Sequence, residues 1–423
     1  MLDIIKHFLQ AKRRWQTLRD AKTLKSYQDK KAREILDYVK EHSSFYRHHW
    51  QGYDSNNWQH LPIINKALMM DNFDKFNTVG IKKDVALKFA HQAETNSKVS
   101  NRFTYGLSSG TSGERGLFVV DHQERAMWAG IVLARVLRQI KPERIALFLR
   151  ANSNLYQTVR RGRFLQFRYF DLSTPLEQSV QLLNTFQPTI LVAPPSILEQ
   201  LTTKREAGRL HIQPERLISV AEVLEPQDKI KLESIFNVPV HQIYQATEGL
   251  LAISCKHGLL HLQEDLIVVQ LESLGDNHFT PIITDLWRKT QPIIRYDLGD
   301  VLRLETEPCT CGNSWRVIKQ IEGRKNDFIE ISTSQGKANL FPDELRQSIL
   351  SVTGVLDYTV IQKGINHLHI YLETSNTFNL VAANVKQCLE KLLQHFDATV
   401  KLEFTRGLPP RESTIKRRRI IRR

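Results

Sequence analysis

The stretch YGLSSGTSGERGLFVV, from Tyr105 to Val120, supports two interpretations that predict different folds and different chemistry. The segment Gly106-Leu107-Ser108-Ser109-Gly110 fits the G-x-S-x-G pattern of a nucleophile elbow, in which Ser108 would be the nucleophile of an esterase. The elbow needs a helix directly after the serine, whereas Ser108 is followed by TSGERG and the strand-like LFVV. The sequence therefore predicts two strands around a glycine-spaced loop, whose backbone N–H groups suit a phosphate chain. A hairpin without function is the alternative.

Composition and charge define a broad class of protein. With 423 residues, 41% hydrophobic and 25% charged, the chain is long enough for two or three globular domains. No apolar run approaches the ~20 residues of a membrane span, and the opening MLDIIKHFLQAKRRW is too polar for a secretory signal, so we expect a cytoplasmic protein. The net charge is +14, of which the last thirteen residues, RESTIKRRRIIRR, carry +6. This cluster suggests a phosphorylated ligand, an acidic partner or a membrane surface.

The residue pattern divides the chain into regions. Residues 1 to about 50 have apolar positions at helical spacing and predict packing helices. From about 100 to 250, short β runs alternate with helices, which predicts an α/β core with a largely parallel sheet. Residues 251–323 are rich in β patterns and predict a barrel-like part or second sheet, which completes an N-terminal domain of residues 1–323. Residues 324–423 predict a small α+β C-terminal domain with the basic tail.

The four cysteines are too few for a disulfide framework in so long a chain, and three of them cluster with a histidine. The cluster consists of Cys255 and His261 in SCKHGLLH, and Cys309 and Cys311 in PCTCG. Three thiolates and one imidazole are the ligands of a tetrahedral structural zinc site, in which the protein fills every position. His257 is the alternative fourth ligand, and three unlinked core cysteines are the alternative to the site. We expect Cys388, on the helical stretch VAANVKQCLEKLL, to be a residue of the hydrophobic core.

Six motifs follow one another along the chain: the loop at 108–113, SVAEVL at 219–224, YQATEG at 244–249, PIIRYDLGD at 292–300, EGRKND at 322–327 and a lysine near the C-terminus. This series resembles the adenylate-forming superfamily of acyl-CoA ligases, and within it the phenylacetate–CoA ligase branch, over most of the chain. The resemblance implies layered α/β sheets and a β-rich part in a large N-terminal adenylate-forming domain, followed by a small mobile lid domain. It also implies that a carboxylate attacks the α-phosphate of ATP, giving an acyl-adenylate and pyrophosphate. The acyl group then passes to a thiol.

The resemblance also assigns nucleotide contacts to particular residues. The β- and γ-phosphates would be cradled by Ser108, Ser109, Gly110, Thr111, Ser112 and Gly113. The family's usual loop lysine is missing here, and Glu114 and Arg115 stand nearby. The remaining nucleotide-binding residues in the first domain would be Ala221, Glu222, Tyr244 and Gln245, with Tyr244 near adenine. Thr247 would contact the α-phosphate and Glu248 would ligate Mg²⁺, a cation that prefers carboxylate oxygen.

Near the domain boundary, the resemblance implies that Asp300 accepts hydrogen bonds from the ribose hydroxyls and that Arg324 supports the same ribose. Asn326-Asp327 would form the hinge of the lid domain. Lys416, followed by Arg419, fits the family's catalytic lysine, which neutralises charge as the adenylate forms. The glycine expected before it is Ile415, and a solvated basic tail is the alternative for Lys416.

Three functions stay open at this stage. The leading one is ATP-dependent ligation of a small carboxylic acid to coenzyme A or to the phosphopantetheine of an acyl carrier protein, with a homodimer left open. The second is an adenylyltransferase that stops at AMP transfer to a small-molecule acceptor. The third is a non-catalytic protein whose basic tail binds nucleic acid or a membrane. The residues do not identify the acid, whose pocket we expect between the turn at 194–196, SVAEVL and YQATEG.

Overall fold

The computed structural model describes residues 2–95, 102–108, 115–137, 139, 141–149, 165–275, 277–325, 328–375, 377–410 and 418–422. The chain forms two compact units. The first comprises residues 1–298 and 303–319, and the second comprises residues 299–302 and 320–423. None of the helices within these described ranges is long and apolar enough to cross a membrane.

The first unit begins with helices, as the helical spacing predicts. They are α1 (Leu2–Thr17), α2 (Ala21–His42), α3 (Ser44–His49), a 3₁₀ helix (Ser55–His60), α4 (Lys66–Asp71), α5 (Phe73–Phe76) and α6 (Lys83–Thr95). Side-chain caps fix several starts: Asp20 accepts the N–H of Thr23 at 2.8 Å, and Asn65 accepts that of Leu68 at 3.0 Å. The helix α2 buries Ile35, among other apolar residues, against the rest of the unit.

The strands on either side of the serine-glycine loop pair as a hairpin, which is not the arrangement of an elbow. The strands β1 (Phe103–Leu107) and β2 (Leu117–Asp121) pair antiparallel, with Leu107 opposite Leu117. The helix α7 (His122–Val136) follows β2, not Ser108, and starts with a capping box of Asp121 and Glu124. The interpretation of Ser108 as a nucleophile on a strand-to-helix turn is therefore disfavoured.

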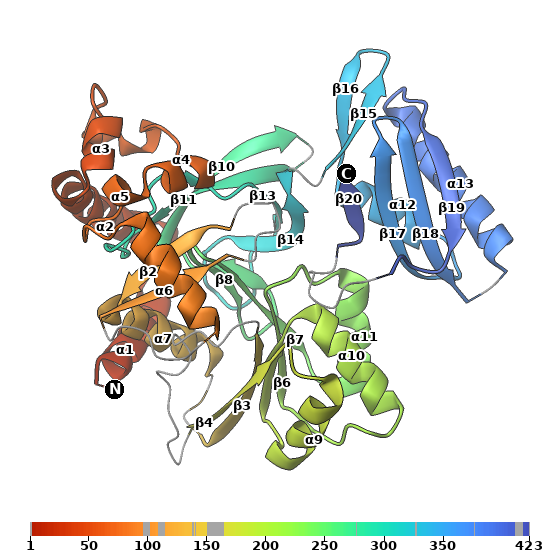
Figure 1. The fold of residues 1–423 in the computed structure, drawn as a ribbon, viewed down its shortest axis with the longest axis horizontal. Helices are drawn as coiled ribbons and strands as arrows, with labels where there is room; N and C mark the ends of the chain where they lie inside the picture. The colour runs from red at the N-terminus through yellow and green to blue at the C-terminus, as the bar shows by residue number, and fades with distance from the viewer. Residues whose placement is uncertain are drawn as a thin grey trace. The chain divides into compact units, whose positions relative to one another are not determined.

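A large sheet forms the centre of the first unit and confirms the predicted α/β core. Its parallel part is ordered β4 (Leu165–Asp171), β3 (Glu143–Leu149), β5 (Ile190–Ala193), β6 (Arg216–Val220) and β7 (Val240–Ala246). The crossover helices α9 (Leu176–Phe186), α10 (Pro195–Glu206) and α11 (Pro226–Phe236) lie together against these strands (Figure 1). Proline at the first position starts both α10 and α11, where its missing N–H costs no helical hydrogen bond.

The β-rich part continues the same sheet and does not form a separate barrel. Antiparallel strands extend it beyond β7 in the order β8 (Gly249–Ser254), β9 (Leu260–Leu262), β14 (Val317–Arg324), β13 (Asp300–Leu304), β11 (His278–Asp285) and β10 (Ile267–Gly275). The short strand β12 (Tyr296–Asp297) pairs with β11. The sequence leaves a barrel-like part or a second sheet open, because a run of β patterns does not show whether its strands join an existing sheet.

The second unit has its own sheet and core. The strands β19 (Lys401–Arg406), β18 (His367–Thr374), β17 (Val355–Gly364) and β20 (Ile420–Arg422) form one sheet, beside a hairpin of β15 (Ile329–Thr333) and β16 (Gly336–Leu340). The helices α12 (Pro342–Leu350) and α13 (Phe378–His395) contribute apolar side chains such as Leu345 and Leu389 to the core. Part of the basic tail is therefore a strand, since Ile420 pairs with Val360 of β17.

Candidate nucleotide and metal sites

The base of the serine-glycine loop is closed by three hydrogen bonds. The N–H of Ser108 donates to the carbonyl of Gly116 at 2.7 Å, and the N–H of Gly116 donates to Ser108 Oγ at 2.6 Å. Arg115 Nε donates to the carbonyl of Ser108 at 2.8 Å. The predicted phosphate-binding residues Ser109, Gly110, Thr111, Ser112 and Gly113 lie outside the described residues. The two ends of their loop are nevertheless held at one point on the first unit.

The turn between β7 and β8 places Thr247 and Glu248 side by side. Thr247 Oγ1 donates to Glu248 Oε2 at 2.9 Å, and the buried hydroxyl of Tyr296 donates to Glu248 Oε1 at 2.8 Å. Both carboxylate oxygens are thereby oriented, yet each keeps lone-pair capacity for a cation. The turn has the chemistry that a magnesium ligand needs.

Lys66 lies at the loop base, although the sequence interpretation did not single it out. The segment before it pairs with the RYD motif, because the N–H of Ile64 donates to the carbonyl of Arg295 at 2.9 Å and the N–H of Asp297 to that of Ile64 at 2.8 Å. A β-carbon built on Gly116 would stand 3.4 Å from Lys66 Cε and 3.4 Å from Ser108 Oγ. The end of the Lys66 stem therefore lies beside Gly116, at the base of the loop whose own lysine is missing. No motif of the sequence marks Lys66, and its position follows from the β-bridge between Ile64 and Tyr296.

The SVAEVL motif contains a strained turn. The N–H of Glu222 donates to the carbonyl of Val220 at 2.8 Å, and Ala221 between them has a φ of 67°. A three-residue turn of this kind is rare for a residue with a β-carbon. The Glu222 carboxylate accepts the N–H and hydroxyl of Ser196 at 3.2 and 3.1 Å, at the start of α10. The side chain of Glu222 thus links the SVAEVL motif to the turn at 194–196. The acid pocket expected between these segments stays a prediction.

Tyr244 and Gln245 lie at the end of β7, next to this turn in the sheet order. Both side chains are half-buried, and the register of β7 against β8 shifts between them. Such an irregularity re-aims side chains at the edge of a site. The structure therefore presents both predicted residues beside the Thr247-Glu248 turn.

The predicted ribose residues meet within the second unit. Arg324 Nε lies 2.8 Å from Asp300 Oδ1, and the N–H of Lys325 donates to the carbonyl of Gly299 at 2.8 Å. Asp300 is buried while the Arg324 side chain is about half exposed. Lys416, Asn326 and Asp327 lie outside the described residues.

Arg419 is not part of a solvated tail. Arg419 Nε lies 2.8 Å from Asp357 Oδ1, both residues are buried, and the carbonyl of Arg419 accepts the N–H of Val360 at 2.7 Å. The ion pair is thus a structural element of the second unit.

The three clustered cysteines and His261 form a compact group in the first unit. Their four ligand atoms all lie within 4.8 Å of one another. Cys255 Sγ is 3.8 Å from Cys309 Sγ, and Cys311 Sγ is 3.6 Å from His261 Nε2. A tetrahedral zinc ion, with bonds of about 2.3 Å to sulfur and 2.0–2.1 Å to nitrogen, would separate these atom pairs by about 3.8 and 3.6 Å. These two atom pairs therefore already have the spacing that the ion requires.

Groups around the cluster orient the ligands. His261 Nδ1 lies 2.9 Å from the carbonyl of Trp315, which can only accept, so Nδ1 carries the proton and Nε2 faces the sulfurs. The N–H groups of His257 and Cys311 donate to Cys255 Sγ and Cys309 Sγ, each at 3.4 Å. His257 therefore supports a ligand through its backbone. Burial raises the pKa of the Cys311 thiol to about 11, a cost that cation coordination would reverse.

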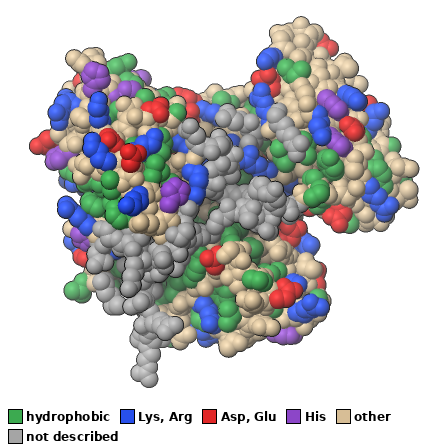
Figure 2. Space-filling view, in the orientation of Figure 1, with side chains coloured by type: hydrophobic (Ala, Val, Ile, Leu, Met, Phe, Trp, Pro, Cys, Tyr) green, Lys and Arg blue, Asp and Glu red, His purple; other side chains and the backbone are tan. Residues whose placement is uncertain are grey.

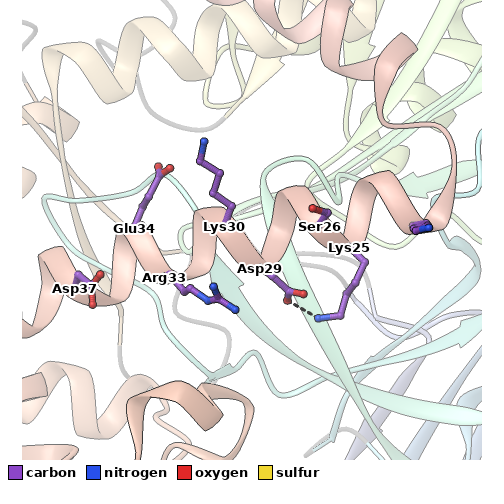
Figure 3. Close-up of a pocket in the computed structure, with 8 residues that line it drawn as sticks. Lys25, Ser26, Asp29, Lys30, Arg33, Glu34 and Asp37 are labelled. Carbon is purple, nitrogen blue, oxygen red and sulfur yellow. Dashed lines mark hydrogen bonds and ion pairs between the residues drawn. The ribbon is translucent and has the colours of Figure 1, made fainter.

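The described surface also has a shallow pocket along α2. It is lined by Lys22, Lys25, Ser26, Asp29, Lys30, Arg33, Glu34 and Asp37 (Figure 3). Lys25 pairs with Asp29 one helical turn away. Figure 2 likewise shows acidic side chains among the Lys, Arg and His side chains over the N-terminal helices. Because charges of both signs alternate here, we assign no ligand to this pocket.

Comparison with solved structures defines the fold. A crystal structure of 2-hydroxyisobutyryl-CoA ligase, in the postadenylation state with 2-HIB-AMP, matches 97% of this chain and 91% of its own with a TM-score of 0.72 and 16% identity. The anthranilate CoA ligase AuaEII, in complex with anthranoyl-AMP, matches 74% of this chain and 65% of its own with a TM-score of 0.53 and 10% identity. The chain has the fold of the adenylate-forming acyl-CoA ligases.

Comparison with curated sequences gives one named relative. Protein CapK of Staphylococcus aureus is 26% identical over 389 residues, which cover 88% of this chain and 82% of that protein. No family model matches the chain. The similarity to CapK thus extends over nearly the whole fold, including the cysteine-bearing part of the first unit.

Proposed function

We propose that this protein activates a carboxylic acid with ATP as an acyl-adenylate, releases pyrophosphate, and transfers the acyl group to a thiol. The observation that carries the proposal is the convergence, in the first unit, of the serine-glycine loop base, Lys66 and the Thr247-Glu248 turn. Ile64 bridges Tyr296 in the PIIRYDLGD motif, which places Lys66 at the base of this loop. The hydroxyl of Tyr296 also orients Glu248. A cation and a magnesium ligand are two of the groups that phosphoryl transfer requires, and the loop at 109–113, outside the described residues, would supply the N–H donors.

The proposed roles follow from chemistry and position. The loop at 108–113 takes the β- and γ-phosphates, Thr247 contacts the α-phosphate, and Glu248 holds Mg²⁺. The strained Ala221 and its neighbours Glu222, Tyr244 and Gln245 bind the adenosine. Asp300 and Arg324 bind the ribose, since an ionised carboxylate suits a pair of hydroxyls. Lys416 acts as the catalytic lysine of the adenylation step.

Lys66 completes the phosphate site in this proposal. The relatives that the motifs resemble place a lysine within the loop, where it neutralises charge on the triphosphate. Here Lys66 approaches the same loop from α4, with its Cε beside Gly116. A point charge on a flexible stem suits phosphate oxygens whose positions change during the reaction.

The finer assignment is to the phenylacetate–CoA ligase-like branch, with coenzyme A or a carrier-protein phosphopantetheine as the acceptor. We favour this branch because the six motifs occur together in the order that the branch has them. Adenylyl transfer to a small-molecule acceptor is the alternative product of the same site. Binding of nucleic acid or membrane by a basic tail is less favoured, because Arg419 and Ile420 are built into the second unit.

The test is acid-dependent exchange of labelled pyrophosphate into ATP across a panel of aliphatic and aromatic acids, with hydroxamate trapping of the activated acyl group. We expect one chemical class of acid to support exchange, and Glu248→Ala to abolish it. Thioester formation with coenzyme A or a carrier protein then identifies the acceptor. A stable adenylylated product without thioester would select the alternative. Full exchange by Glu248→Ala would refute the proposed site.

We also propose that Cys255, His261, Cys309 and Cys311 hold a structural zinc ion. The fit of both measured ligand spacings to tetrahedral geometry, together with the oriented His261 tautomer, supports this assignment. Four protein ligands leave no open coordination position, so the ion would stabilise the fold and take no part in the reaction.

A further inference from the structure

The segment after β11, Asp285 to Gln291, folds back toward the candidate site. Asp285 Oδ1 accepts the N–H groups of Trp287 at 2.7 Å and Arg288 at 2.8 Å, which fixes a tight turn. Arg288 and Gln291 are then directed inward and are only 6% and 1% exposed. Polar side chains buried in this way are costly unless they have hydrogen-bond partners.

These partners come from two segments of the site that are far apart in sequence. Arg288 Nη1 donates to the carbonyl of Thr247 at 2.7 Å, and Nη2 donates to Gln291 Oε1 at 2.8 Å. Gln291 Oε1 also accepts the N–H of Val119 at 2.8 Å, while Gln291 Nε2 donates to the carbonyl of Leu117 at 3.0 Å. Arg288 and Gln291 therefore join the Thr247-Glu248 turn to β2, the strand that leaves the serine-glycine loop.

The turn is consequently held from two sides. Arg288 binds the backbone carbonyl of Thr247, and Tyr296 binds the side chain of Glu248. A buried guanidinium is costly unless its hydrogen bonds are satisfied, and an apolar residue could fill the same space at lower cost. Arg288 instead connects the Thr247-Glu248 turn, through Gln291, to β2.

We propose that Arg288 is a positioning residue that fixes the magnesium-binding turn relative to β2. This inference rests on the proposed function. It predicts that loss of Arg288 weakens the binding of Mg²⁺ and of MgATP by letting Glu248 move relative to β2, while the fold of the segment persists. The segment has an independent anchor, since Glu124 Oε1 accepts the N–H groups of Lys289 at 2.6 Å and Thr290 at 2.8 Å.

The experiment compares Arg288→Met with Arg216→Met in the full-length protein. Arg216 is a matched control because it is also buried and bonds a carbonyl, that of Val136, and a carboxylate oxygen of Glu143, at 3.2 Å. The measurements are the thermal midpoint, the calorimetric Kd of MgATP, and the half-saturating Mg²⁺ concentration at fixed ATP. Removing a group that orients a metal ligand typically lowers metal affinity 10–100-fold.

We expect Arg288→Met to raise the half-saturating Mg²⁺ concentration about tenfold. Arg216→Met should lower the midpoint and leave Mg²⁺ dependence unchanged. Arg288→Lys retains the charge and one hydrogen bond, so its half-saturating Mg²⁺ concentration should lie between those of the parent and of the Met variant. It replaces the Met variant in the comparison if that variant does not fold. Parent-like Mg²⁺ dependence in both Arg288 variants, or an equal shift in Arg216→Met, overturns this inference alone. Failure of the parent protein to bind MgATP overturns the proposed function and the inference with it.

Discussion

Removal of one ligand from the Cys/His cluster should release zinc and destabilise the first unit. The perturbation is Cys311→Ser, and the matched control is Cys388→Ser, because Cys388 lies on α13 outside the cluster. Four candidate protein ligands within 4.8 Å of one another and an oriented His261 predict tight binding. At a free zinc concentration about 1,000 times the Kd, the ion stabilises the fold by about 4 kcal/mol.

This free energy converts to a measurable shift. A unit of about three hundred residues changes its thermal midpoint by roughly 2 °C per kcal/mol, so the shift on losing zinc is about 8 °C. Trp15 packs edge-on against the His261 ring at 5.8 Å and against Trp315 at 4.8 Å, so tryptophan fluorescence should change as well. Cobalt substitution should give the absorption of a tetrahedral site with thiolate ligands.

The assays are metal content by mass spectrometry, differential scanning calorimetry and fluorescence during chelator titration. We expect one zinc per parent chain and per Cys388→Ser chain, and much less in Cys311→Ser. Parent protein that contains no zinc and gains no stability when zinc is added would refute the assignment. Equal zinc loss in Cys388→Ser would show that the measured ion is bound elsewhere.

Two further predictions concern the nucleotide site. Lys66→Ala should raise the KM for ATP about tenfold or more in pyrophosphate exchange, because a charge-assisted hydrogen bond to phosphate contributes about 1.5–3 kcal/mol; an unchanged KM would exclude Lys66 from the phosphate site. Burial raises the pKa of Asp285 from 3.8 to about 6. Ionisation therefore costs folded-state stability as pH rises from about 4 through 6, and the cost persists above that range. The stability advantage of Asp285→Asn over the parent should therefore be larger at pH 8 than at pH 4 by at least about 1 kcal/mol. Chemical denaturation at both pH values checks this, and an equal advantage at the two pH values would contradict it.

Much of the architecture could be predicted because it depends on local patterns. Alternation of buried β runs with helices predicts the parallel strands around Ile190 and Val240, and the absence of a helix pattern after Ser108 predicts the hairpin. The basic tail was harder to interpret. Its Ile420-Ile421 pair joins β17 only through long-range packing, which charge counting does not indicate.

The candidate site could be predicted only where its chemistry follows a motif. Thr247 and Glu248 stand out because they lie in an ordered series of motifs, and their turn is where the motif predicts. Lys66 and Arg288 carry no such local pattern, since each acts on a segment that is brought to it by tertiary structure. Bridges such as Ile64 to Tyr296 cannot be inferred from residue spacing.

The packing of Trp15 has a consequence for the order in which the chain folds. This side chain near the N-terminus rests against His261 and Trp315, and the Trp315 indole donates to the carbonyl of Leu18 at 2.7 Å. During synthesis α1 can pack against α7 early, but Trp15 must wait until about three hundred residues have left the ribosome before it meets these partners. This side chain therefore lacks its aromatic partners in the interval and is open to chaperones or to aggregation. Zinc uptake at His261 would then mark the end of that vulnerable period.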